Sequence, residues 1–167
     1  LTVDTHCDTP IRMAGSEFDL GLKHDEACVD FPRMNEGGLD AEFFVVFISQ
    51  GPRNDTAYNI AHRQALKIFN VIHSNVKKNS SMAEIALRPD DAYRLKKGNK
   101  ISAFIGLENG YPMGKDISRI KEYYDLGARY ITLCHSVNND ICDSSTDSKG
   151  SEHNGLSAFG EEVVKEM

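Results

Sequence analysis

The sequence predicts an α/β protein built on a parallel sheet. Segments with the composition of buried strands alternate with segments whose apolar residues recur every three or four positions, as on one face of a helix. Acidic residues and histidines follow the ends of several predicted strands. A (β/α)₈ TIM-like barrel takes about 250 residues. Only four clear strands are predicted, which could form a small open sheet; if the fold is a barrel of eight strands, the 167 residues of this chain hold roughly half of it.

The composition suits a folded protein and excludes several classes of function. The chain has 19 Lys+Arg and 25 Asp+Glu, which gives a net charge of −6. Because it has no basic stripe to neutralise phosphates, we expect no nucleic-acid partner. Its longest apolar runs, such as residues 43–48, are far shorter than the ~18 residues of a membrane-spanning helix. Localisation stays open, since a signal sequence could have preceded Leu1.

Two strands are predicted in the first third of the chain. Residues 1–6 have the pattern of a short strand that ends in a polar cluster and a turn near Pro10. Residues 11–40 contain several Gly and Pro and are expected to be irregular. The apolar run 41–49 indicates a strand buried on both faces, and Gly51-Pro52 ends it.

Two helices are predicted next. Residues 55–79 carry an apolar stripe at helical spacing, and Asp55 or Thr56 is the expected N-cap. The stripe consists of Ala57, Ala61, Ala65, Ile68, Ile72 and Val76. A shorter helix over 89–97 is expected to end at Gly98.

The last third repeats the alternation. Residues 101–107 form a predicted strand, 116–126 a helix capped by Asp116, and 128–134 another strand. A loop rich in Ser, Asp, Asn and Gly covers 136–156, and a helix opens at Ser157. We expect residues 1–167 to form a single domain.

The first candidate site is the His6-Cys7-Asp8 segment after the first strand. Residues i and i+2 of an extended chain point the same way, so His6 and Asp8 could reach one ion. Zn²⁺ accepts imidazole nitrogen and carboxylate oxygen together. The alternative is a capping or surface pair, because the motif is very short.

Glu108 and His135 follow two later strands. A carboxylate after the apolar run 101–107 costs free energy unless it is paired, and a metal ion or backbone N–H groups of the next turn would pair it. His135 is a candidate ligand, general acid–base or donor to an oxyanion, or simply a hydrogen-bonded structural residue.

The remaining cysteines and histidines are assigned no role in the site. No Cys-x-x-Cys pair occurs, which excludes a zinc ribbon, although one disulfide stays open. Cys7 and Cys134 neighbour site candidates but should face the other side of the sheet. The histidines expected to be structural or solvated are His24, His62, His73 and His153.

Several segments of the chain together form a recognisable pattern. They are residues 3–10 (VDTHCDTP), 30–38 (DFPRMNEGG), 41–47 (AEFFVVF), 106–110 (GLENG), 126–139 (LGARYITLCHSVNN), 155–160 (GLSAFG) and 163–167 (VVKEM). In this order, over nearly the whole chain, they resemble the membrane (renal) dipeptidase family. Asn109 stands where the family has a glycine.

The resemblance implies the N-terminal portion of an amidohydrolase-like (β/α)₈ barrel, and a dipeptidase that uses two zinc ions. His6 and Asp8 would bind the first Zn²⁺, and Glu108 would bridge both ions. His135 would bind the substrate and the oxyanion of the tetrahedral intermediate. A hydroxide held between the ions would then attack the peptide carbonyl of a small dipeptide.

The resemblance also identifies what these residues lack. The family's two further histidine ligands, its catalytic Asp and its carboxylate-binding Arg lie beyond the point that corresponds to Met167, so we expect no turnover from residues 1–167 alone. Two alternatives are a related metal-dependent amidohydrolase acting on another small amide and an inactive homologue that only binds. Family members often dimerise, so a homodimer is allowed. The dipeptide preference, its L or D stereochemistry and the metal used in vivo stay open.

Overall fold

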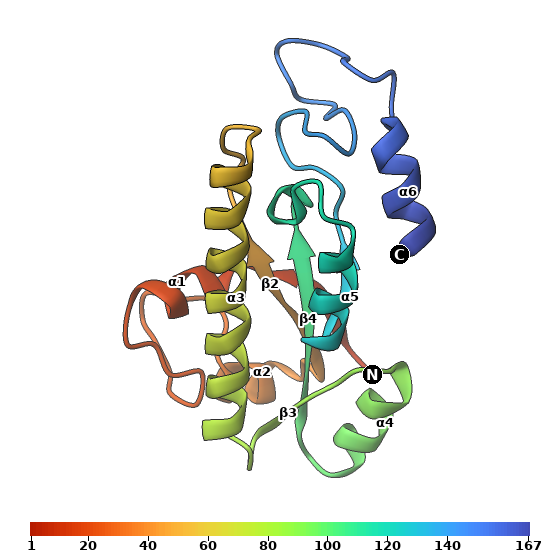
Figure 1. Ribbon diagram of the computed structural model, residues 1–167. Coiled ribbons are helices and arrows are strands. Elements are labelled where there is room, and N and C mark those ends of the chain that lie inside the picture. Colours follow the sequence, from red (N-terminus) through yellow and green to blue (C-terminus); the bar gives the residue numbers. More distant parts are fainter. The chain divides into compact units, whose positions relative to one another are not determined.

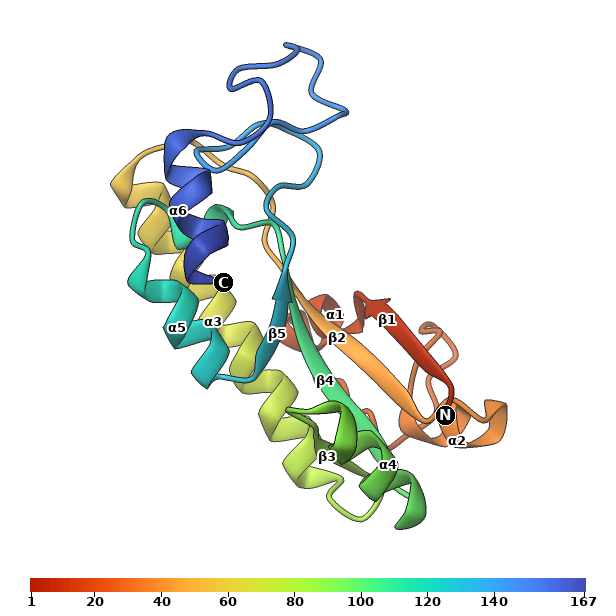
Figure 2. The ribbon, with the colours of Figure 1, turned by 90° about the vertical axis from the view of Figure 1, so that its right-hand side faces the viewer.

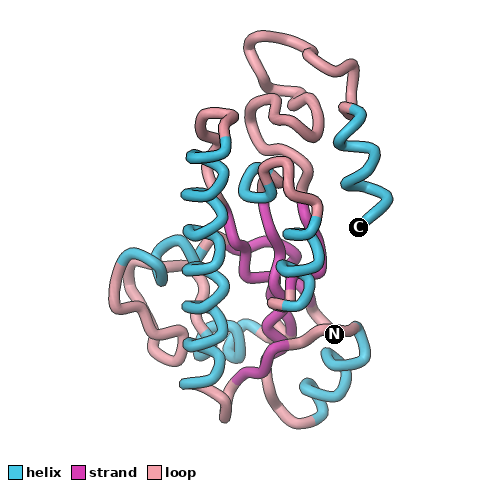
Figure 3. The backbone as a smooth tube through the Cα atoms, in the orientation of Figure 1, coloured by secondary structure: helices cyan, strands magenta, loops and turns pink.

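The computed structural model describes residues 1–167 and alternates strands with helices (Figure 3). In chain order the elements are β1 (Val3–Cys7), α1 (Thr9–Gly15), α2 (Phe31–Gly37), β2 (Ala41–Phe47), α3 (Asp55–Lys78), β3 (Ala83–Ile85), α4 (Pro89–Lys97), β4 (Ile101–Glu108), the 3₁₀ turn η1 (Tyr111–Met113), α5 (Ser118–Asp125), β5 (Ala128–Ile131) and α6 (Ala158–Glu166). The strands are ordered β1-β2-β4-β3, and β5 pairs with β4. Since β1 pairs with β2 and β3 with β4 in parallel, the predicted α/β fold with a parallel sheet is confirmed.

The chain forms two compact units, each made of two stretches of sequence. Unit 1 contains Leu1–Val46 and Lys67–Gly106, and unit 2 contains Phe47–Leu66 and Leu107–Met167. By these ranges β2, α3 and β4 each begin in one unit and end in the other. The single domain over residues 1–167 stays a prediction.

One core cluster of unit 1 lies between α4 and the strands β2 and β4. Ala92 and Leu95 of α4 are buried with Ala41 of β2 and Phe104 of β4. The ring of Phe43 stacks on that of Phe104, with centroids 4.8 Å apart. Figure 1 shows β3 leading into α4. Apolar residues of β2 and β4 are thus removed from water by a helix that the sequence predicts.

The expectation that residues 11–40 are irregular is wrong. This stretch contains most of α1 and all of α2, and each helix has a proline in its first turn, where the missing N–H costs nothing. Asp30 caps α2, because its Oδ1 accepts a hydrogen bond of 2.9 Å from Arg33 N. Gly38 ends the helix at φ 72°. Both helices have 7 residues, too short for an apolar stripe to become visible.

Unit 2 has a separate core to which the long loop contributes. Ile120 of α5 and Val163 of α6 are buried with Ile141 and Cys142, which belong to the predicted loop 136–156. Figure 2 shows α5 running beside β5. Gly160 of α6 lies so close to this loop that a Cβ there would be 2.0 Å from the carbonyl oxygen of Ile141. The loop is therefore packed against a helix.

The apolar stripe of α3 has the predicted orientation, but the helix ends differ from the prediction. All its members except Ala57 are buried. The N-terminal cap is Asn54, whose Oδ1 accepts a 3.0 Å hydrogen bond from Ala57 N, and not Asp55 or Thr56. No helix of the structure is long and apolar enough to cross a membrane.

The end of α4 and the starts of α5 and α6 lie close to the predicted positions. The left-handed residue after α4 is Asn99, at φ 54°, while Gly98 has φ −87°. α5 begins at Ser118, and Asp116 Oδ1 accepts a hydrogen bond of 3.1 Å from Ser118 N at the start of the helix. Ser157 caps α6 as predicted, because its Oγ accepts a hydrogen bond of 2.9 Å from Gly160 N.

Glu42 on β2 is the one fully buried carboxyl group without a hydrogen-bond partner. Its side chain is 0% exposed, and neither of its oxygens is hydrogen-bonded. Burial, with a smaller contribution from Asp4, raises the pKa of Glu42 from 4.5 to about 8. The folded chain therefore holds Glu42 protonated at neutral pH, whereas the unfolded chain ionises it.

We predict that Glu42 makes the fold less stable as pH rises. Between pH 4.5 and about 8 the unfolded state releases this proton and the folded state keeps it. The free energy of unfolding should then fall by up to about 1.4 kcal/mol per pH unit from this group. Glu42→Gln should remove that dependence, so the free energy of unfolding of the variant should compare best with that of the unmutated chain at pH 8. Urea denaturation at pH 5, 6, 7 and 8 measures it.

The exposed Glu36→Gln is the matched control and should leave the pH profile unchanged. Parallel profiles for the Glu42→Gln variant and the unmutated chain would contradict the prediction.

Candidate metal centre

His6 and Asp8 form a pair at the carboxyl end of β1, in unit 1. His6 is in the strand and Asp8 directly follows it, before α1 begins. The Nε2 of His6 lies 3.6 Å from Oδ1 of Asp8, and the two side chains are 41% and 57% exposed. The i, i+2 spacing thus brings an imidazole nitrogen and a carboxylate oxygen to one place that water or an ion can reach.

Asp8 does not use its carboxylate to cap the helix that follows. It occupies the N-cap position of α1, but its side chain makes no capping hydrogen bond. Cys7, between the two candidates, is buried, and its sulfur lies 3.1 Å from Oγ1 of Thr9. Burial also raises the pKa of the Cys7 thiol, so it stays neutral. Of the three residues, only His6 and Asp8 offer exposed ligand atoms.

Glu108 and His135 form a second pair, in unit 2. Glu108 is the last residue of β4, and His135 lies in the segment after β5. The Nε2 of His135 lies 3.5 Å from Oε1 of Glu108. The Glu108 side chain is 16% exposed and that of His135 45%. The ring of Phe47 packs edge-on against the imidazole at 5.0 Å between centroids.

Asn109 connects the ends of three strands beside this pair. Its backbone has φ 73°, a left-handed conformation that asparagine tolerates better than most residues. Its Nδ2 donates a hydrogen bond of 3.0 Å to the carbonyl of Ile48 after β2, and its Oδ1 accepts one of 3.2 Å from Tyr111 N. Its own N–H donates 2.8 Å to Oγ1 of Thr132 after β5. Asn109 thus satisfies backbone groups that have no partner in the sheet.

Asn139 continues the network into the long loop. Its Nδ2 donates 2.7 Å to the carbonyl of Leu133 and also contacts Oδ1 of Asn109 at 3.3 Å. β5 ends at Ile131 and not at residue 134 as predicted, and the carbonyl of Leu133 bonds to this side chain. Ser144 Oγ donates 2.7 Å to the carbonyl of His135, which fixes the backbone of the histidine itself.

Asp143 organises the outer part of the loop, and sequence reasoning missed it. Its carboxylate accepts backbone hydrogen bonds from Glu152, His153 and Gly155, at 2.9 to 3.0 Å. These bonds hold the pKa of Asp143 far below its usual range. An aspartate in a Ser- and Gly-rich stretch was the available signal, since such residues bind local backbone N–H groups.

The loop also forms a polar hollow with the segment after β2. The hollow has a volume of about 500 Å³, and its wall includes Gln50, Arg53, Asn138 and Glu152. Arg53 makes two hydrogen bonds to the carboxylate of Glu152, at 2.7 and 2.8 Å. Gln50 is within 3.5 Å of the side chain of Asn109.

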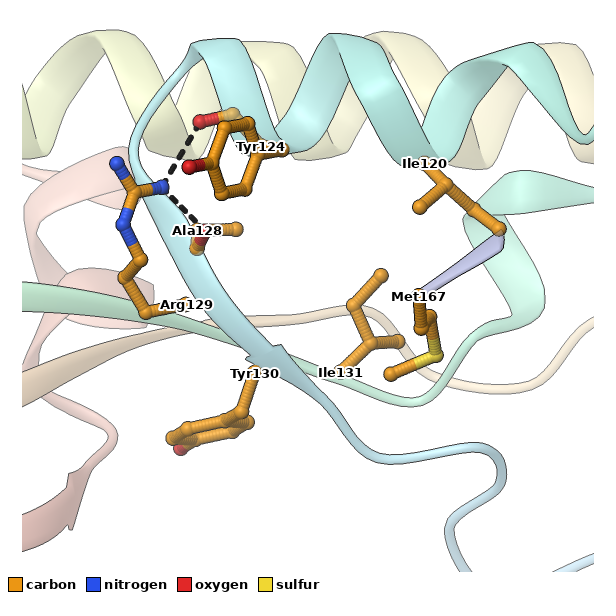
Figure 4. A pocket seen from close by; sticks show the side chains of 7 residues that line it. All are labelled: Ile120, Tyr124, Ala128, Arg129, Tyr130, Ile131 and Met167. Carbon is orange, nitrogen blue, oxygen red and sulfur yellow. Dashed lines mark hydrogen bonds between the residues drawn. The ribbon is translucent and has the colours of Figure 1, made fainter. Parts of the chain in front are cut away.

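A smaller, more apolar hollow lies elsewhere in unit 2 (Figure 4). It measures about 130 Å³ and contains none of the predicted site residues. Its lining is Ile120, Tyr124, Ala128, Arg129, Tyr130, Ile131 and Met167. Figure 4 shows Arg129 turned toward the backbone, with hydrogen bonds of 3.0 and 2.7 Å to the carbonyls of Tyr124 and Ala128. These residues belong to α5, to β5 and to the position that follows α6, and none follows the carboxyl end of a strand, so we assign the hollow no part in the site.

Three of the histidines outside the site make hydrogen bonds of structural type. His24 contacts the carbonyl of Asp19 at 2.7 Å, and His62 contacts the hydroxyl of Tyr123 at 2.8 Å. His153 contacts the carbonyl of Asn139 at 2.9 Å.

The four predicted site residues occur as two pairs, His6 with Asp8 in unit 1 and Glu108 with His135 in unit 2.

Sequence comparison places the whole chain in one family. The model of the family described as membrane dipeptidase (peptidase family M19) matches residues 1–167. Dipeptidase tcpJ of Claviceps purpurea is 29% identical over 143 residues, which cover 83% of this chain and 33% of the relative. Dipeptidase verJ of Clonostachys rogersoniana is 29% identical over 176 residues, covering 99% of this chain and 45% of the relative. The chain thus spans less than half the length of these curated relatives.

Solved structures have the same fold. The probable dipeptidase PvdM from Pseudomonas aeruginosa superposes with a TM-score of 0.80 at 21% identity, covering 99% of this chain and 43% of that one. A metallo peptidase from Rhodobacter sphaeroides, liganded with a phosphinate mimic of the dipeptide L-Ala-D-Ala, gives 0.81 at 18% identity, covering 99% and 55%. With the fold in agreement and the family model matched from the first residue to the last, the chain belongs to the membrane dipeptidase family, peptidase family M19.

Proposed function

We propose that this chain supplies part of the active site of a zinc-dependent dipeptidase. His6, Asp8 and Glu108 would hold zinc, with Glu108 shared between two ions, and His135 would contact the substrate. The observation that carries the proposal is the exposed His6–Asp8 pair, whose carboxylate is left unused by the helix it precedes. The family match over residues 1–167 supports the choice of reaction.

The donor set is suited to such a metal. The proposed ligands are the imidazole of His6 and the carboxylates of Asp8 and Glu108. Zn²⁺ binds histidine nitrogen and carboxylate oxygen, and two-metal hydrolases use a shared carboxylate between their ions. The buried thiol of Cys7 stays outside this set.

Zinc bound by these residues would lower the pKa of water and polarise the scissile carbonyl. The chain's own residues would then orient the substrate. The His135 imidazole, anchored through its backbone and packed on Phe47, can donate a hydrogen bond to the oxygen anion that develops on the substrate. The exposed position of this imidazole leaves room for a small substrate beside it.

The names of the relatives support a dipeptide as substrate. The fungal relatives are called dipeptidases, and the Rhodobacter sphaeroides enzyme was crystallised with a mimic of L-Ala-D-Ala. We extend this substrate class to the present protein as part of the proposal. A homodimer stays a prediction.

Zinc binding tests the ligand assignment without any assay of activity. Asp8→Asn and Glu108→Gln should each weaken zinc binding by more than about 100-fold, because even changes behind the ligands of a metal site cost about 10- to 100-fold. Equilibrium dialysis with metal analysis measures the affinity.

His73→Ala and the exposed Glu161→Gln are the matched controls and should bind zinc as the unmutated chain does. Unchanged affinity in the Asp8 and Glu108 variants would remove these residues from the proposed site.

Hydrolysis of glycyl-D-alanine tests the reaction. The complete reading frame should cleave it, lose activity on chelation and regain it with zinc, whereas residues 1–167 alone should show no turnover. Retained zinc binding without hydrolysis of a dipeptide panel would instead favour another small amide as substrate, or a protein that binds without cutting.

Asn109 should act as a positioning residue for the Glu108–His135 pair. Asn109→Gly keeps the left-handed backbone but removes the side chain's bonds to Ile48 and Tyr111. We expect kcat to fall by about tenfold or more with little change in KM, since small displacements of reacting groups are costly. Steady-state kinetics on the complete protein, with circular dichroism to verify folding, measures the effect. Equal kcat values in the two proteins would show that the network does not position the pair.

A further inference from the structure

Two cysteines of unit 2 have no part in the proposed function. Cys134 directly precedes His135, and Cys142 lies in the loop that follows. Both are free thiols; Cys142 is buried and Cys134 partly buried. They pack in one apolar cluster that also contains Ile141 and Val163.

Asn139 holds the backbones around the two cysteines together. Its Nδ2 donates 2.7 Å to the carbonyl of Leu133, the residue before Cys134. Its Oδ1 accepts 3.1 Å from Cys142 N, and its own N–H donates 3.1 Å to the Cys142 carbonyl. One residue therefore binds the chain on both sides of Cys142 and immediately before Cys134.

The side chains converge as well. Cys134 Sγ donates a hydrogen bond of 3.4 Å to the carbonyl of Asp143, the residue that follows Cys142 in the chain. Both thiols lie in the same apolar cluster. Burial, with a smaller contribution from the Cys134 thiol, raises the pKa of Cys142 to about 12. The sulfur atoms are thus neighbours in the reduced protein.

We propose that Cys134 and Cys142 are a redox-active pair that forms a reversible disulfide. The bond would tie the chain segment that carries His135 to the loop that carries Asn139 and Ser144. It would form inside a cluster whose backbone is held by the hydrogen bonds of Asn139. This inference goes beyond the proposed dipeptidase function and does not depend on it.

The oxidant is a small-molecule disulfide such as oxidised glutathione. Cys134, the more accessible thiol, loses its proton to solvent, and its thiolate attacks one sulfur of the reagent. This breaks the reagent's S–S bond and releases one thiolate. Cys142 then loses its proton and attacks Cys134 Sγ, forming the protein disulfide and releasing the second thiolate. Two protein thiols are oxidised by two electrons, the reagent is reduced by two, and the two released thiolates take up the two protons.

Thiol labelling tests the pair directly. The protein is equilibrated with mixtures of reduced and oxidised glutathione, unfolded in acid, alkylated and cut with a protease that cleaves before aspartate. Asp140 lies between the two cysteines, so cleavage separates them unless they are linked. We expect one cross-linked peptide pair, without alkyl groups on Cys134 or Cys142, that comes apart on reduction.

Two variants sharpen the result. Cys142→Ala keeps the buried position apolar and should leave Cys134 as a mixed disulfide with glutathione. Cys28→Ser changes an exposed cysteine of unit 1 and should leave the cross-link unchanged. A melting temperature that is higher for the oxidised protein than for the reduced one should be seen in the Cys28→Ser variant and lost in the Cys142→Ala variant.

The proposal is overturned if both thiols stay open to alkylation in the most oxidising mixture. It is equally overturned if the unmutated protein accumulates glutathione on Cys134, or links Cys134 to another cysteine. Because labelling needs no substrate, a protein without dipeptidase activity can still pass this test, and an active one can fail it.

Discussion

The constraint on which this structure depends is that backbone groups at the carboxyl ends of the strands have no partner in the sheet. A buried N–H or carbonyl left without a hydrogen bond costs about 1–3 kcal/mol. In unit 2, Asn109 and Asn139 remove this cost by binding the carbonyls of Ile48 and Leu133. Asparagine suits this task because its amide both donates and accepts. The neutral side chains of Asn109 and Asn139 thus hold the loops after β2, β4 and β5 in place.

Because asparagines bind the backbone groups at the strand ends, the carboxylates of Asp8 and Glu108 are not needed for this purpose. Where a carboxylate does organise backbone, as Asp143 does, it is surrounded by N–H groups and has little capacity for another ligand. Asp8, by contrast, stands before a helix without capping it, and the turn after Glu108 is held by Asn109. The groups that fix the backbone and those proposed to bind zinc are therefore different residues. Such a separation allows a site to stay ordered whether or not a metal is bound.

Sequence patterns were sufficient where burial sets the structure and insufficient where single hydrogen bonds do. The apolar runs and stripes of β2, α3 and β4 predict those elements, because their residues are buried along most of their length. Helices α1 and α2 are too short to show a period, and the proline and Asp30 signals at their starts are local. The site candidates were found because they follow strands. The sequence context of Asp143 was a signal for backbone binding, but the particular backbone partners of Asn139 and Asp143 could not be predicted, since the sequence does not display which groups the fold brings near them.

The carboxyl groups on the strands show why position alone does not make a metal ligand. Glu42 lies within β2, fully buried, and the cost of burying its charge keeps it protonated near neutral pH. A protonated carboxyl cannot coordinate a cation without first losing its proton, so metal binding at such a place would be opposed by desolvation. Asp8 and Glu108 come at strand ends, where one is exposed and the other keeps partial access to water beside an imidazole. Burial thus makes a carboxyl group within a strand a poor metal ligand, whereas a carboxylate at the end of a strand keeps its charge at a lower cost in free energy.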